Sequence, residues 1–120
     1  MDLRMKATIY HNPRCSKSQA TKTLLETAGV KLEVIEYLET PPSRETLMTL
    51  LTKLELEAKD LVRTGEPDFK ASGVNLRTAT PERIVDLMIA YPKLIQRPIV
   101  EVTHAARIGR PPEAVLELFE

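Results

Sequence analysis

Cys15 is the single cysteine of this 120-residue chain and the residue best suited to do chemistry. A free cysteine is often a buried and inert core residue, and residue type alone leaves that interpretation open. The neighbours of Cys15 favour a reactive thiol instead. Arg14 and Lys17 supply positive charge, which lowers the pKa of a nearby thiol. Ser16 and Ser18 supply hydroxyl donors that can stabilise a thiolate. The local sequence therefore predicts that Cys15 is a nucleophile.

Ser18 and His11 flank Cys15 at spacings that suit a supporting role. The spacing Cys15-x-x-Ser18 predicts a hydroxyl that donates to the thiolate across one helical turn. Serine forms no disulfide, so a second, resolving thiol must come from another molecule. Alternatively, Ser18 satisfies backbone groups of the first turn. His11 is either a cationic or proton-passing neighbour of the thiolate, or a strand-end residue that holds the loop by hydrogen bonds.

A metal site built on His11 and Cys15 lacks ligands. The one other histidine, His104, is remote in sequence, and the chain has no further thiol. A zinc site takes three or four nitrogen, sulfur or carboxylate ligands. We therefore predict no metal.

Three arginines stand in settings that could serve an anion site. Arg63 lies at an expected helix end, and Arg97 and Arg110 each directly precede a proline. A residue before proline is biased out of helical conformation, so its side chain projects from a restricted backbone. Guanidinium groups match tetrahedral oxyanions bidentately. Each arginine is also compatible with an ordinary solvated surface position, and the sequence alone does not bring the three together.

The first third of the chain predicts a β-α-β unit with Cys15 at its functional edge. Strands are expected over 7–10 and 32–38, and a helix over 16–28, where apolar residues recur at helical spacing. This order implies a right-handed crossover and parallel pairing. Cys15 then lies at the carboxyl edge of the sheet and at a helix N-terminus, where a thiolate is stabilised.

The middle of the chain predicts an inserted helical segment over about 43–92. Ser43 is a good N-cap for a helix with a leucine stripe. Thr80 is expected to cap a second helix that starts at a proline. Between them, residues 58–79 predict only short helical turns, because glycine and proline interrupt the pattern.

The end of the chain predicts two strands and a helix. Residues 99–103 and 105–108 are expected to pair antiparallel around a turn near His104, and Pro111 starts the helix. The whole order predicts an α/β fold with a thioredoxin-like mixed four-stranded sheet (β-α-β, inserted helices, β-β-α), flanked by helices on both faces. With no repeat or linker, residues 1–120 are expected to form a single domain.

The composition narrows the classes of partner. Seventeen Lys and Arg balance seventeen Asp and Glu, so no global field attracts nucleic acid or an anionic membrane. The two phenylalanines, three tyrosines and absent tryptophan make a base-stacking surface unexpected. The N-terminus lacks the features of an export signal, and no run reaches membrane-spanning length. A lone cysteine suits a reducing compartment, so we expect a cytoplasmic protein with no nucleic-acid or membrane partner.

Five sequence blocks together resemble the glutaredoxin-coupled, single-cysteine arsenate reductases. The blocks are residues 11–18, 37–44, 61–63, 97–100 and 110–113. They span nearly the whole chain and are specific in combination, whereas Cys-x-x-Ser alone is a weak signal. The resemblance implies a thioredoxin-like fold with an inserted helical segment.

The resemblance also implies roles for the matching residues. Cys15 is expected to be the nucleophile, with His11 and Ser18 at positions that tune its thiolate. Pro98 matches a proline held in cis beside the active cysteine. The expected oxyanion-binding set is Arg63, Arg97 and Arg110.

The implied activity is the reduction of arsenate to arsenite. The Cys15 thiolate attacks arsenate, glutathione attacks the adduct, and glutaredoxin supplies the final reducing equivalents. The implied partners are arsenate or a similar oxyanion, glutathione as co-substrate, and glutaredoxin, with no tightly bound cofactor. The pair Ser16-Lys17 departs from the small residues of well-studied reductases, and a lysine there can alter the oxyanion preference.

Two other functions stay open. Spx-type regulators share the superfamily, bind RNA polymerase and sense oxidation through Cys-x-x-Cys. Ser18 in place of the second cysteine removes that switch here. The other function is thiol transfer on glutathione adducts without arsenic.

Overall fold

The computed structural model describes residues 5–120, and the chain divides into two compact units. One unit joins the residues up to Thr40 with Arg97–Glu120, and the other is Pro41–Gln96. The helical insertion predicted over about 43–92 falls inside the second unit. That the two units form one domain over 1–120 stays a prediction.

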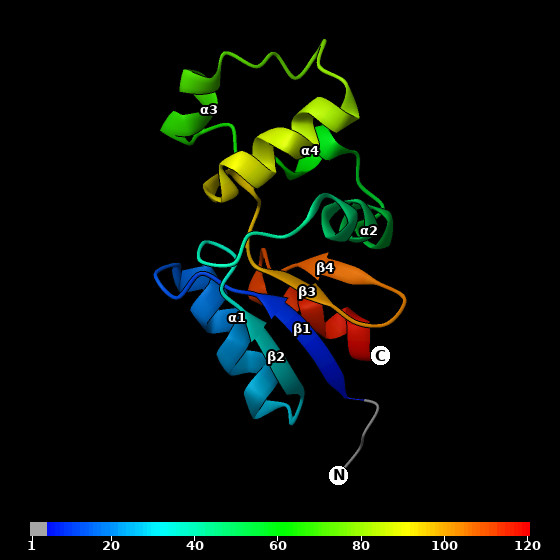
Figure 1. Ribbon diagram of the computed structural model, residues 1–120. Helices are drawn as coiled ribbons and strands as arrows, with labels where there is room; N and C mark the ends of the chain where they lie inside the picture. Colours follow the sequence, from blue (N-terminus) through cyan, green and yellow to red (C-terminus); the bar gives the residue numbers. More distant parts are fainter. Residues whose placement is uncertain (1–4) are drawn as a thin grey trace. The chain divides into compact units, whose positions relative to one another are not determined.

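The first unit contains a four-stranded mixed sheet of order β2-β1-β3-β4 (Figure 1). β1 pairs in parallel with β2 and antiparallel with β3, and β3 pairs antiparallel with β4. The predicted parallel pair and the predicted C-terminal hairpin are both confirmed. The strands are β1 (Lys6–Tyr10), β2 (Lys31–Ile35), β3 (Ile99–Glu101) and β4 (Ala106–Ile108).

Two helices of the first unit share a core with the sheet. Helix α1 (Ser16–Thr27) and the 3-10 helix η3 (Pro112–Phe119) pack against each other and enclose buried residues of β1 and β3. Ile9, Leu25, Val100 and Val115 are fully buried there. Burying each such side chain stabilises the fold by about 1.5–3 kcal/mol. This core fixes α1, and with it the residues at the start of α1, to the sheet.

Two predicted strands extended at least two residues too far at their carboxyl ends, and backbone hydrogen bonds show why. β2 ends at Ile35 rather than at Leu38, because the carbonyl of Glu36 accepts the N–H groups of Glu39 and Thr40 at 3.0 and 2.9 Å and turns the chain. β3 ends at Glu101 because the N–H of Val102 donates to the carbonyl of Ala105 at 2.9 Å. That bond closes the hairpin two residues earlier than expected.

The second unit is helical. The two predicted N-caps are confirmed: Ser43 accepts the N–H of Thr46, and Thr80 accepts the N–H of Arg83. Helix α4 packs against α2 and η1. The helices are α2 (Arg44–Leu54), η1 (Ala58–Leu61), α3 (Pro67–Ser72), α4 (Pro81–Ala90) and η2 (Pro92–Leu94).

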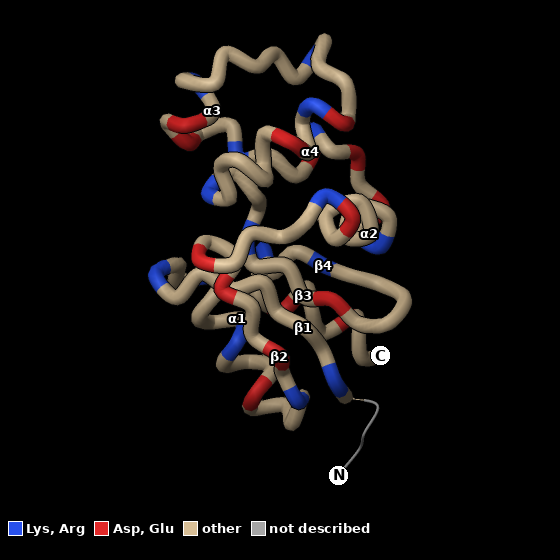
Figure 2. Tube along the Cα trace, in the orientation of Figure 1, with Lys and Arg blue, Asp and Glu red and all other residues tan. Residues whose placement is uncertain are grey.

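In the part of the chain that the structure describes, the charged residues and the helices show neither a region of one charge sign nor a long apolar segment. Basic and acidic residues are interspersed along the trace in both units (Figure 2). Within residues 5–120, no helix combines the length and the apolar character needed to cross a membrane. Any anion site on this chain must therefore depend on a local group of cations.

Candidate active site

Cys15 is the N-cap residue of α1 and follows the loop that leaves β1. Its backbone is extended, with φ −96° and ψ 122°. Its N–H donates to the carbonyl of Asn12 at 3.0 Å, and its carbonyl accepts the N–H of Gln19 at 2.9 Å. The residue is only 9% exposed. The sulfur is thus held at the start of a helix, where the first N–H groups have no helical partners.

The surroundings of Cys15 lower the pKa of its thiol below the ordinary value of 9.0. Burial is the largest single influence and raises this pKa, because it disfavours the thiolate. The backbone N–H groups of Ser18 and Lys17, together with the guanidinium of Arg97, lower it and outweigh burial. The N–H groups at the start of α1 and the guanidinium of Arg97 therefore both favour the thiolate. The sequence predicted the contribution of the helix N-terminus.

The pH dependence of alkylation should report this shift. The thiolate forms as pH rises through the pKa, so a lowered pKa makes Cys15 reactive at lower pH than a free thiol. We expect the rate of iodoacetamide alkylation to rise with pH and to reach half of its plateau at a lower pH than in the urea-unfolded chain. Because the chain has one cysteine, mass spectrometry of the intact protein follows this site alone. A midpoint at or above that of the urea-unfolded chain would contradict the assignment.

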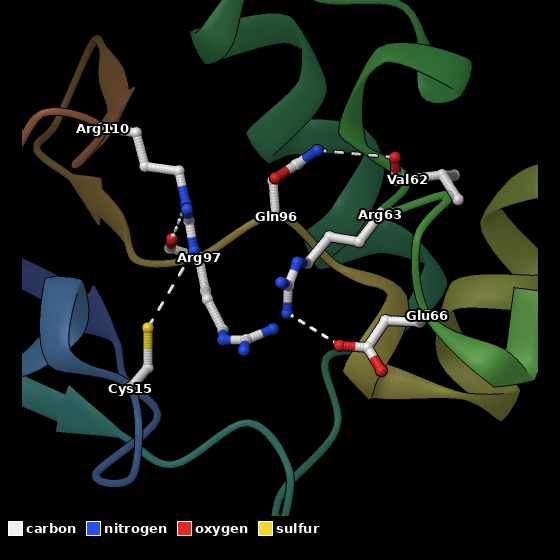
Figure 3. Close-up of polar contacts among 7 residues, drawn as sticks. All are labelled: Cys15, Val62, Arg63, Glu66, Gln96, Arg97 and Arg110. Carbon is white, nitrogen blue, oxygen red and sulfur yellow. Dashed lines mark hydrogen bonds and ion pairs between the residues drawn. The ribbon is translucent and has the colours of Figure 1, made fainter.

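Arg110 and Arg97 meet at Cys15 from the C-terminal part of the first unit. The Nε of Arg110 donates to the carbonyl of Arg97 at 2.7 Å, and a terminal nitrogen of Arg110 lies 4.0 Å from the Cys15 sulfur (Figure 3). The Arg97–Pro98 peptide bond is cis, as the resemblance implied for Pro98, and the Arg110–Pro111 bond is cis as well. Two guanidinium groups of the first unit thus lie near the Cys15 sulfur.

Gly109 allows the arginine segments to approach α1 closely. A Cβ built on Gly109 would lie 2.5 Å from the Oγ1 of Thr21 and 2.8 Å from the Cγ of Pro98. Thr21 is fully buried, and its hydroxyl donates to the carbonyl of Lys17 at 2.8 Å, so it has little room to move. The N–H of Gly109 donates to the carbonyl of Pro98 at 2.9 Å. Only glycine fits here without displacing Pro98 or Thr21.

Gly109→Ala should therefore destabilise the protein and disturb the site. Overpacking of this kind costs about 1–3 kcal/mol. We expect a lower midpoint of urea unfolding and a higher pKa of Cys15, because displacement of Pro98 moves the adjacent Arg97. Gly65→Ala is the control, since a Cβ on Gly65 meets nothing within 4 Å. Equal stability of Gly109→Ala and Gly65→Ala would contradict the packing argument.

The hydroxyl of Ser18 has partners other than the thiolate. It is fully buried, lies 2.7 Å from the Nδ1 of His11 and accepts the N–H of Asn12 at 3.0 Å. The expected hydroxyl contact with Cys15 is thus replaced by contacts that hold the loop. The part of Ser18 that favours the thiolate is its backbone N–H. A buried hydroxyl bonds to the polar groups that surround it in the fold, and sequence spacing does not identify those groups.

His11 is buried inside the loop, and its surroundings favour the neutral imidazole. Burial lowers the pKa of its imidazole, and the nearby Lys22 lowers it further, although Glu36 and Glu26 oppose this. The lowered pKa therefore makes the ring less able than a free imidazole to supply positive charge to the thiolate. Its backbone N–H donates to the carbonyl of Ile35 at 2.8 Å. Of the two interpretations left open by the sequence, these bonds favour the one in which His11 holds the loop.

Arg63 belongs to the second unit. Its N–H donates to the carbonyl of Leu94, and its guanidinium donates to the Oε1 of Glu66 at 2.9 Å (Figure 3). The structure brings Cys15, Arg97 and Arg110 together within the first unit. That Arg63 joins them stays a prediction.

Sequence reasoning assigned no role to Asn12, although it lies at the centre of the loop. Its side-chain Oδ1 accepts the N–H of Arg14 at 3.0 Å, and the residue is 9% exposed. An asparagine at the start of a turn is a recognisable signal for this bond. Among the residues described, no group of three or more His, Cys, Asp or Glu side chains is placed to hold a metal ion.

A thiol at the start of the helix after β1, beside a mixed sheet with a cis-proline segment, places the chain in the thioredoxin-like class. Residues 10–118 match the ArsC family. The chain belongs to this family.

Individual relatives cover nearly the whole chain. The structure named "Arsenate reductase from Vibrio cholerae" is 45% identical with a TM-score of 0.91, covering 94% of this chain and 97% of that one. The arsenate reductase of Escherichia coli K12 is 37% identical over 93% of this chain and 79% of its own length. The uncharacterized protein YfgD of the same organism is 47% identical over 92% of this chain and 93% of its own.

Proposed function

We propose that the chain is an arsenate reductase that works through a Cys15 thiolate, with glutathione and glutaredoxin as the source of electrons. The observation that carries the proposal is a thiol of lowered pKa with the guanidinium groups of Arg97 and Arg110 beside it. A nucleophile next to fixed positive charge suits an anionic electrophile. The arsenate reductases among the relatives point to arsenate as that electrophile.

The first step forms a bond between sulfur and arsenic. The Cys15 thiolate attacks arsenate, and one arsenate oxygen leaves as water after protonation. Arg97 and Arg110 neutralise the oxyanion as the thiolate approaches, because each guanidinium offers paired N–H donors to two oxygens. Arg63 of the second unit is proposed as the third arginine of this set.

The second step needs an outside thiol, because the chain has no other cysteine. Glutathione attacks the cysteine–arsenic adduct, and arsenic(V) takes up two electrons to become arsenic(III). The two electrons come from the sulfurs of Cys15 and glutathione, which are left joined as a mixed disulfide, and a glutaredoxin thiolate then takes the glutathione from that disulfide. Arsenite departs and Cys15 returns as a thiolate. Glutathione is kept reduced in the cytoplasm, and we place the reaction there.

The test is reduction of arsenate by purified protein with glutathione and glutaredoxin. Arsenite should accumulate with all three present and fall to background when arsenate, glutathione or glutaredoxin is left out in turn. An arsenite yield no higher than that of a mixture without the protein would remove the proposal.

The same preparation separates the two other functions. Release of glutathione from a glutathionylated peptide, without any arsenate turnover, would favour general thiol transfer. Recovery of RNA polymerase α subunits by the tagged protein, with no turnover, would favour an Spx-type regulator.

A further inference from the structure

We infer that Asn12 is a positioning residue for the thiolate, acting through the loop that presents Cys15 to the first N–H groups of α1. The inference rests on Cys15 being the reacting thiol of the proposed function. This positioning makes the thiol reactive before any substrate binds.

Asn12 makes three hydrogen bonds that together define residues 12–18. Its Oδ1 accepts the N–H of Arg14, and its carbonyl accepts the N–H of Cys15, each at 3.0 Å. Its own N–H donates to the hydroxyl of Ser18, also at 3.0 Å. The first two bonds close a turn directly before Cys15. The third ties that turn to the first turn of α1.

The turn sets the backbone of Cys15, and the backbone sets the place of the sulfur. Cys15 needs an extended conformation at the N-cap for its side chain to face the helix start. The N–H groups of Ser18 and Lys17 and the guanidinium of Arg97 then favour the thiolate. These interactions weaken steeply with distance, so a loosened turn should raise the thiol pKa.

The side-chain amide supplies what other residues supply less well. Asparagine bonds its own backbone two residues on, and serine does so more weakly. Alanine offers no acceptor, which leaves the N–H of Arg14 without this partner. Aspartate offers an acceptor but adds negative charge near the thiolate, which would itself raise the thiol pKa. Asparagine therefore closes the turn without opposing the charge on sulfur.

The second unit contains a matched turn that serves as a control. The Oδ1 of Asn75 accepts the N–H of Arg77 at 2.9 Å, and its carbonyl accepts the N–H of Thr78 at 3.2 Å. These two turn bonds and the arginine two residues on match those at Asn12, whereas Asn75 is exposed and Asn12 is buried. Replacing Asn75 removes an equivalent turn bond at a place that holds no cysteine.

The experiment measures the pH dependence of iodoacetamide alkylation for wild type, Asn12→Ala, Asn12→Ser and Asn75→Ala. We expect Asn12→Ala to raise the pKa of Cys15, which moves the alkylation profile to higher pH and lowers the alkylation rate near pH 7 below that of wild type. Asn12→Ser should give an intermediate profile. Asn75→Ala should match wild type.

Two outcomes would overturn the inference. One is an Asn12→Ala profile that coincides with wild type, and the other is an equal shift in Asn75→Ala. If circular dichroism shows that Asn12→Ala does not fold, Asn12→Ser against Asn75→Ala decides in the same way. The assay contains no arsenate, so the failure of arsenate turnover and the failure of this inference are separate results.

Discussion

Cys15→Ser is expected to abolish arsenate reduction while leaving the fold intact. Loss of a catalytic nucleophile lowers turnover by at least about 10³-fold. Serine is a favoured N-cap residue, and Cys15 occupies the N-cap of α1, so the variant should be no less stable than wild type. The measurement is arsenite formation with glutathione and glutaredoxin, beside thermal unfolding of both proteins.

Thr23→Ala is the control for this experiment, because Thr23 is an exposed residue of the same helix, α1. It should keep most of the activity. Turnover in Cys15→Ser within a few-fold of wild type would show that another group carries the reaction. A large loss of stability in Cys15→Ser would instead show that the thiol is part of the packing.

Arg97→Ala should cause the second largest loss, through two separable effects. Arg97 helps lower the pKa of Cys15, so its removal should move the alkylation profile to higher pH. Removal of a donor that stabilises developing oxyanion charge lowers kcat by about 10²–10³-fold. Arg97→Lys keeps a charge but loses the planar fork, so its activity should fall between wild type and Arg97→Ala. Steady-state turnover and alkylation together measure both effects.

Arg107→Ala is the matched control, since Arg107 lies in β4 of the same unit and pairs with Glu117 at 3.4 Å. This exposed pair contributes little to stability, and neither readout should change. If Arg97→Ala and Arg107→Ala have the same alkylation profile, Arg97 does not act on the thiolate. If both keep wild-type turnover, the proposed oxyanion site is misplaced.

The fold could be predicted from the sequence where local signals were strong. Ser43 and Thr80 are residue types that favour helix starts, and each caps its helix as expected. The β-α-β order implied a parallel pair, and β1 and β2 form it. The ends of β2 and β3 were missed because turns set by Glu36 and Ala105 depend on backbone bonds that no residue pattern specifies.

The site was predictable in composition but not in its contacts. The thiol, the helix start and the arginines could be read from residue types. The contact between Cys15 and Arg110 joins residues 95 positions apart, and a pattern does not encode such pairings. The partners of Ser18 were also missed. Its hydroxyl contacts both His11 and Asn12 inside a buried loop, and residue spacing does not specify these contacts.

The lone thiol has a consequence for damage by oxidants. A thiolate reacts with peroxide to give a sulfenic acid, and many proteins protect that species by forming an internal disulfide. Cys15 is the single cysteine of the chain, so this protection requires a thiol from outside. Without one, further oxidation to the sulfinic acid is irreversible. The supply of external thiol therefore governs how long each molecule stays active under peroxide stress, as well as the rate of the proposed reaction.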